Sequence, residues 1–117
     1  MKLISHRGNL TGPNPERENN PDYIWEAIQA GYDVEIDVWW VDGKFKLGHD
    51  EPKYHFPFSL IERHYNKLWI HCKNMDALSQ LNELDSSGLK VNYFSHESDF
   101  GVLTSRGYIW STNVYKR

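Results

Sequence analysis

The chain has 117 residues and a formal net charge of −3, with 39% hydrophobic, 25% charged and 15% aromatic residues. This length predicts one domain spanning residues 1–117, because domains cluster near roughly 100–150 residues. The composition argues against an intrinsically disordered chain, which would be poor in aromatics, and no apolar run approaches the ~18 residues of a membrane-spanning helix.

Acidic residues are concentrated in one part of the chain. Between Glu16 and Glu51 there are ten Asp or Glu and three Lys or Arg. This excludes the basic footprint of a typical nucleic-acid-binding protein. Such an acidic surface repels phosphate unless a cation offsets its charge.

The cysteine content bears on the cellular setting. Cys72 is the only cysteine, so no intrachain disulfide can form, and the first six residues lack the apolar segment of a signal peptide. We therefore expect a reducing, cytoplasmic setting.

The first elements can be read from turn and cap residues. A short strand, Lys2 to Ser5, precedes a loop rich in Gly and Pro. Asn20 then suits an N-cap, Pro21 suits the first helical position, and Gly31 suits the position after a helix. This predicts a helix over 21–30.

A hairpin follows this helix. Residues 32–41 alternate between apolar and polar side chains, which predicts a strand. Asp42 and Gly43 form a tight turn, and 44–48 return as a second strand.

Further elements continue the alternation of strands and helices. We expect, in order, a short helix near 59–65, a strand over 67–73, a helix capped by Asn74 and ended by Gly88, a strand over 89–95 and a last strand over 107–114. This order predicts an α/β fold with a mostly parallel sheet and one β-hairpin.

Polar residues follow several of the expected strands. Ligands of parallel α/β folds bind at the carboxyl edge of the sheet, so residues there are candidates for a site. Eight candidates stand at or near this edge: His6, Arg7, Glu35, Asp37, His49, His71, Lys73 and His96.

Each candidate has two interpretations. Glu35 and Asp37 share one strand face, with Cβ atoms roughly 7 Å apart, and could grip a divalent cation or remain solvated charges. His71 and Lys73 have the parity to face a site together or to form a mixed polar strand face. A lone histidine such as His6 is usually a structural residue, and a catalytic role is the alternative. By the same parity, Cys72 is expected to be a buried structural thiol.

The order of the motifs is more specific than any one of them. It runs His6-Arg7-Gly8, Glu18-Asn19, Glu35-Ile36-Asp37, Asp42-Gly43 and His49-Asp50. This order resembles the glycerophosphodiester phosphodiesterase family over residues 1–50, and the strand over 67–73 fits more loosely.

The resemblance implies a phosphodiesterase on a TIM barrel of the phospholipase-C-like kind. It implies that His6 and His49 act as general acid and base. It implies that Glu35 and Asp37 bind Mg²⁺ or Ca²⁺, and that Arg7 and Lys73 contact the substrate phosphate.

Two features depart from the family pattern. His71 stands where the family usually supplies a third metal carboxylate, so affinity for Ca²⁺ should fall. The length is about half of the ~250 residues typical of a complete barrel, which predicts a truncated, TIM-barrel-like partial (β/α) sheet. Its open edges invite pairing, so a homodimer is one expectation.

The leading hypothesis is metal-dependent hydrolysis of a small phosphodiester. The alternatives are a non-catalytic module that binds a phosphate ester and a metal, and an inactive remnant of the family.

Overall fold

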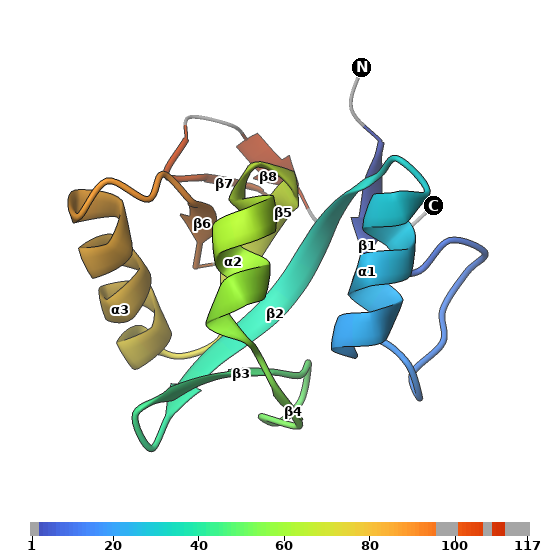
Figure 1. Cartoon of the computed structure of the whole chain (residues 1–117), viewed down its shortest axis with the longest axis horizontal. Helices are drawn as coiled ribbons and strands as arrows, with labels where there is room; N and C mark the ends of the chain where they lie inside the picture. Colours follow the sequence, from blue (N-terminus) through green and yellow to red (C-terminus); the bar gives the residue numbers. More distant parts are fainter. Residues whose placement is uncertain (1–2, 96–100, 107–108, 112–117) are drawn as a thin grey trace.

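The computed structural model describes residues 3–95, 101–106 and 109–111, and Figure 1 shows helices lying against an open sheet. The elements, in chain order, are β1 (Ile4–His6), α1 (Pro21–Gln29), β2 (Asp33–Val41), β3 (Lys44–Leu47), β4 (Tyr54–His55), α2 (Phe58–His64), a 3-10 turn η1 (Tyr65–Lys67), β5 (Leu68–Cys72), α3 (Met75–Ser86), β6 (Asn92–Phe94), β7 (Gly101–Leu103) and β8 (Ile109–Ser111).

The main sheet is mixed and has six strands in the described part of the chain. Its order is β4-β3-β2-β5-β6, with β1 also paired to β2. The strands β1, β2, β5 and β6 run parallel, whereas β3 and β4 run antiparallel to their neighbours. The long strand β2 is central: β1 pairs along its first half, β3 along its second half, and β5 along the other edge.

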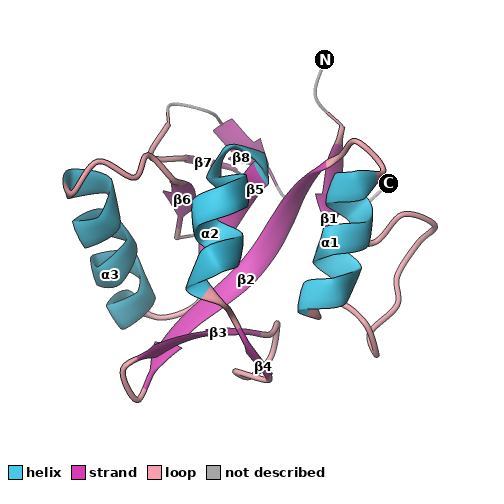
Figure 2. Cartoon of the chain, viewed as in Figure 1, coloured by secondary structure: helices cyan, strands magenta, loops and turns pink. Residues whose placement is uncertain are grey.

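The hydrophobic core lies between this sheet and the three helices, which cover one of its faces (Figure 2). Ile24 of α1, Ile61 of α2 and Leu81 of α3 are fully buried there against β2 and β5. A second, smaller cluster of Trp69 and Phe94 lies apart from this core. This division follows from strand alternation, which sends successive side chains to opposite faces.

Local capping explains where α1 and α3 begin, as the sequence predicts. The side chain of Asn20 accepts a hydrogen bond from the backbone N–H of Asp22, and that of Asn74 accepts one from Ala77, both at 2.9 Å. Gly31 adopts a φ of 94°, a conformation that favours glycine after a helix. The helix predicted over 21–30 is therefore confirmed.

The predicted hairpin is also confirmed. Asp42 and Gly43 both have positive φ, 52° and 74°, and join β2 to β3. Positive φ at both central residues matches the right-handed twist of the two strands, and Asp-Gly is a favoured pair for it.

Other elements differ from expectation in extent. The strand expected over 89–95 is limited to β6, because the backbone N–H of Leu89 bonds back to Leu84 and that of Val91 bonds to Leu89. The strands β4 and β7 were not expected. Of the strand expected over 107–114, only β8 lies within the described residues. Lys2 of the first expected strand and the candidate His96 lie outside them.

The free edge of β6 is partly occupied by the chain itself. The hydroxyl of Ser105 accepts a hydrogen bond from the backbone N–H of Tyr93 at 2.9 Å and donates one to the carbonyl of Val91 at 3.1 Å. The backbone N–H of Ser105 bonds to the Tyr93 carbonyl. Among the helices of the described residues, none has the length and apolar character needed to cross a membrane.

Candidate functional site

The candidate site lies on the face of the sheet that carries Glu35 and Asp37 of β2. Strand register sets their neighbours: His6 of β1 is paired with Glu35, and His71 of β5 is paired with Asp37. The alternation that directs Val34, Ile36 and Val38 into the core directs these polar side chains to the opposite face. Three strands thus bring residues far apart in sequence to one place.

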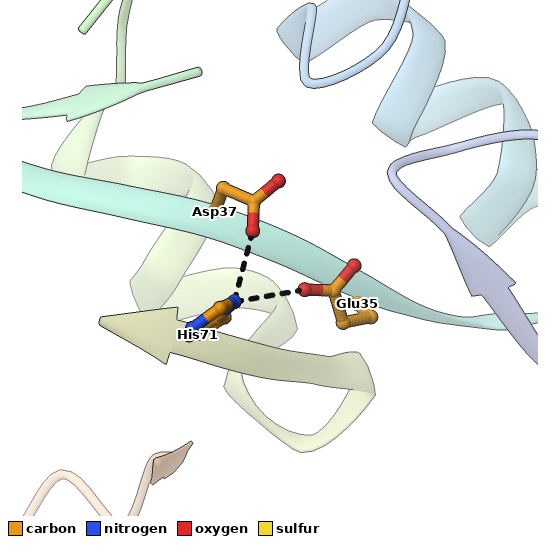
Figure 3. Close-up of side chains that lie close together, drawn as sticks. All are labelled: Glu35, Asp37 and His71. Carbon is orange, nitrogen blue, oxygen red and sulfur yellow. Dashed lines mark ion pairs between the residues drawn. The ribbon is translucent and has the colours of Figure 1, made fainter. Parts of the chain in front are cut away.

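Glu35, Asp37 and His71 form a group that could hold a metal ion. One ligand atom from each lies within 4.8 Å of the others. The Nδ1 atom of His71 is 3.2 Å from Oδ1 of Asp37 and 3.9 Å from Oε2 of Glu35. Dashed lines in Figure 3 mark these two ion pairs. Glu35 and Asp37 are 2% and 0% exposed, so the interpretation of the two as solvated charges is wrong.

Two buried oxygens of this group accept no hydrogen bond, namely Oε1 of Glu35 and Oδ1 of Asp37. Buried polar atoms are normally satisfied, so such a pair signals strain or a missing ligand. Burial, and then the charge of Asp37, raise the pKa of Glu35 well above its usual value. Two adjacent buried carboxylates thus do not both ionise readily without a cation.

Asp37 is the carboxylate that stays ionised. Burial acts to raise its pKa, but the close contacts with His49, His71 and Asn19 lower it and outweigh burial. The net result is a pKa below its usual range. The negative charge of the pair is therefore concentrated on Asp37.

Arg7 lies beside Asp37 and links three side chains. Its Nε is 3.1 Å from Oδ2 of Asp37, its Nη1 donates to Glu18 at 3.0 Å, and its Nη2 is 3.3 Å from Nε2 of His49. The backbone of Arg7 has a φ of 59°, an unusual value for a non-glycine residue. The guanidinium therefore partly neutralises the carboxylates of Asp37 and Glu18, and its Nη2 is directed toward His49.

Sequence reasoning missed two residues that hold this arrangement together. The side chain of Asn19, which is 0% exposed, donates to Oδ2 of Asp37 at 3.0 Å and accepts from its backbone N–H at 2.9 Å. Glu18 accepts hydrogen bonds from Arg7, from the Asn9 side chain and from the Asn14 backbone. The Glu18-Asn19 motif was the available signal, but only the fold assigns it these partners.

His6 lies at the carboxyl end of β1 and is partly exposed. Its Nε2 is 3.5 Å from Oε1 of Glu35. Burial and then the positive charge of Arg7 lower its pKa to about 4. The imidazole of His6 is therefore uncharged at neutral pH.

His49 lies just after β3, which pairs with the same edge of β2 as β1, and its side chain is 43% exposed. Its Nδ1 is 3.4 Å from Oδ2 of Asp37, and its Nε2 is 3.7 Å from Asp50. Gly48 precedes it, and a Cβ there would overlap the carbonyl oxygen of Glu51. The glycine thus permits the tight path that brings His49 to Asp37.

Lys73 directly follows β5, and its positive charge weakly opposes the rise in the pKa of Glu35. Cys72 is buried in the core, where desolvation raises the pKa of its thiol to about 12. This agrees with the structural thiol expected from the sequence. His55 is exposed, and His64 contacts the ring of Trp25, remote from these residues in the fold.

A cavity of about 310 Å³ adjoins the site on the side of Arg7 and His49. Glu18 and Asn19 line it from the loop before α1, and Lys53 lines it from the segment after β3. The cavity carries both signs of charge and gives solvent access to one nitrogen of Arg7 and to the imidazole of His49.

The comparisons with known proteins found no match: no protein-family model, no curated protein and no solved structure matches the chain.

Proposed function

We propose that this protein catalyses metal-dependent hydrolysis of a small phosphodiester, as its resemblance to glycerophosphodiester phosphodiesterases implies. The observation that carries the proposal is that six candidate residues, five from the motifs and His71, lie together on one face of the sheet. They come from three strands and two loops and are His6, Arg7, Glu35, Asp37, His49 and His71.

The residues present fit a divalent cation. Glu35 and Asp37 supply buried oxygens without hydrogen bonds, and His71 supplies a nitrogen beside them. The resemblance implies Mg²⁺ or Ca²⁺. When bound, such an ion would offset negative charge on the phosphoryl oxygens in the transition state.

His6 and His49 are proposed as the general acid and base. Asp37 and its neighbour Glu35 hold one imidazole each, at 3.4 Å from His49 and 3.5 Å from His6. A carboxylate that holds an imidazole fixes its orientation and tautomer, which proton transfer requires. One imidazole would take a proton from the attacking hydroxyl or water, and the other would protonate the leaving alkoxide.

Arg7 and Lys73 are proposed to bind the phosphate. The Nη2 of Arg7 is directed toward His49 and the adjoining cavity, where a non-bridging oxygen could accept its hydrogen bond. Lys73 would add a second positive charge at the end of β5.

The fold is consistent with part of a barrel. The parallel strands β1, β2, β5 and β6 are neighbours in chain order and are connected by α1, α2 and α3. This is the arrangement of three successive β-α units and a fourth strand of a (β/α) barrel, and we propose a truncated barrel on this basis. We also propose that two copies of the chain form a homodimer by pairing the open edges of their sheets. The proposed cellular setting is the reducing cytoplasm.

Hydrolysis of bis(p-nitrophenyl) phosphate tests the enzyme proposal. We expect turnover that requires Mg²⁺, Ca²⁺ or Mn²⁺ and falls at least ~100-fold in His6→Ala, because general acid–base catalysis contributes roughly 10²–10⁴-fold. The matched control is His55→Ala, which removes an exposed histidine and should retain activity. No turnover with any of the three ions, or full turnover in His6→Ala, would contradict the proposal.

A second candidate is a module that binds a phosphate ester and a metal without cleavage, including an inactive remnant of the family. It is favoured by one observation: the Nε and Nη1 of Arg7 are already engaged by Asp37 and Glu18. Calorimetry showing phosphate-ester binding with no hydrolysis would support this candidate over the enzyme.

A further inference from the structure

We propose that His71 makes the metal group selective for a transition ion, such as Zn²⁺ or Fe²⁺, over Mg²⁺ and Ca²⁺. The inference rests on the proposed metal site and departs from the ions that the family resemblance implies. It concerns which ion the residues of this chain prefer, and it does not require catalysis.

The ligand atoms of the group are a mixed set of nitrogen and oxygen. The two carboxylates suit hard ions such as Mg²⁺ and Ca²⁺, which take oxygen ligands almost exclusively. The imidazole of His71 is a borderline ligand that suits Fe²⁺, Ni²⁺, Cu²⁺ and Zn²⁺. Two carboxylates with one imidazole therefore offer Ca²⁺ fewer hard ligands than three carboxylates would.

The orientation of the His71 ring is restricted by its neighbours. Its ring is stacked on Phe94, with centroids 5.2 Å apart and planes 9° from parallel. The paired register of β2 and β5 fixes its Cα opposite that of Asp37. The ring therefore presents Nδ1 to both carboxylates, at 3.2 Å and 3.9 Å, from a defined orientation.

Burial strengthens the preference. Glu35 and Asp37 are almost fully buried, and His71 is 17% exposed. Mg²⁺ usually keeps several of its waters, and Ca²⁺ takes six to eight oxygen ligands. Zn²⁺ is satisfied by four ligands, so a small, buried group of three protein atoms suits it better.

The test compares metal affinities of the unmodified protein with those of two variants, after removal of metal by a chelator. His71→Glu restores a third carboxylate, and His71→Gln keeps a neutral side chain of similar size but offers oxygen. Calorimetry gives the Kd for Mn²⁺, Zn²⁺, Mg²⁺ and Ca²⁺. The matched control is His55→Glu, at an exposed position on β4.

The test depends on how each variant changes the ratio of Zn²⁺ to Ca²⁺ affinity. Absolute affinities are not enough, because most sites bind Zn²⁺ more tightly than Mg²⁺ whatever their ligands. We expect His71→Glu to reduce the ratio of Zn²⁺ to Ca²⁺ affinity at least ~100-fold, with His71→Gln reducing Zn²⁺ affinity ~10-fold or more. Pulsed electron paramagnetic resonance of bound Mn²⁺ should detect coupling to an imidazole nitrogen, which both variants lose.

The outcomes separate this inference from the proposed function. Transition-ion binding through His71 without phosphodiester hydrolysis supports the inference and contradicts the enzyme. Hydrolysis that depends on Ca²⁺ or Mg²⁺, with affinity ratios unchanged in both variants, overturns the inference alone. Failure of all four ions to bind overturns both. Thermal unfolding of each variant confirms that loss of binding is not loss of fold.

Discussion

At the scale of single residues, the unusual feature is a carboxylate pair that is buried and incompletely satisfied. Asp37 is stabilised by Asn19, Arg7 and two imidazoles, whereas Glu35 has an oxygen that accepts no hydrogen bond. Removing a charge from water without full compensation costs several kcal/mol. The fold thus keeps Glu35 at a cost to its own stability, as is common where a site serves a ligand.

This cost predicts a pH dependence of stability. Because the pKa of Glu35 is raised above its usual 4.5, the folded protein retains a proton that the unfolded chain releases. Stability of the metal-free protein therefore falls as pH rises above about 4.5, by up to ~1.4 kcal/mol per pH unit, until the folded pKa is passed. Glu35→Gln should abolish this contribution.

Urea unfolding from pH 4.5 to pH 8 measures the contribution of Glu35 to this pH dependence. The contribution is the difference in the free energy of unfolding between the unmodified protein and Glu35→Gln at each pH. His6 has a lowered pKa and acts in the opposite direction, since its stability contribution is lost as pH falls through 6.5 toward 4. It is present in both proteins, so the difference reports on Glu35 together with its interactions with His6 and Asp37. Glu62→Gln, at an exposed position of α2, should leave the slope unchanged; equal slopes for all three proteins would refute the argument.

At the scale of secondary-structure elements, Asn74 connects three of them. Its side chain caps α3 through Ala77 and also exchanges two hydrogen bonds with the backbone of Trp40 on β2, at 3.2 Å and 3.0 Å. Since it also follows β5, this one residue fixes the ends of two adjacent strands relative to a helix. The same end of the sheet carries His71 and Lys73.

We expect Asn74→Ala to lower the free energy of unfolding by about 2–3 kcal/mol, because a helix cap is lost and two backbone groups of Trp40 lose partners. Asn74→Asp keeps the cap acceptor but loses the donor to the Trp40 carbonyl, so it should be intermediate. Chemical unfolding followed by Trp fluorescence measures both. A loss below ~0.5 kcal/mol in Asn74→Ala would show that the bridge to β2 carries no stability.

At the scale of the whole molecule, the sheet is open and therefore has edge strands that could pair with another chain. An exposed strand edge is a template for pairing with another chain. The edge of β6 is short and partly occupied by Ser105, which satisfies backbone groups of Tyr93 and Val91. The chain thus reduces the length of edge that a second copy could use there.

Ser105→Ala should therefore promote self-association. It removes the acceptor for the Tyr93 N–H and leaves that donor free to pair with another strand. We expect a concentration-dependent increase in sedimentation coefficient, together with a stability loss of about 1–2 kcal/mol. Ser79→Ala, at an exposed position of α3, is the control. If both variants sediment alike at all concentrations, the hydroxyl of Ser105 does not limit pairing.

Local signals in the sequence predicted the local parts of the fold. Asn20 and Pro21, the Asp42-Gly43 turn and the Asn74 cap act within a few residues, and the structure agrees with each. Strand alternation placed Glu35 and Asp37 on one face but could not tell what covers that face. Their burial and the part played by Asn19 depend on contacts between distant segments, which no local pattern encodes.

The central position of β2 has a consequence for how this site could change over time. Three other strands pair with β2, so substitutions at Glu35 or Asp37 disturb the element on which the rest of the sheet depends. His71 lies one strand away, at a partly exposed position. During evolution, a change of ion preference is therefore expected to arise most easily by substitution at position 71. Substitution of either carboxylate of β2 would disturb folding as well as function.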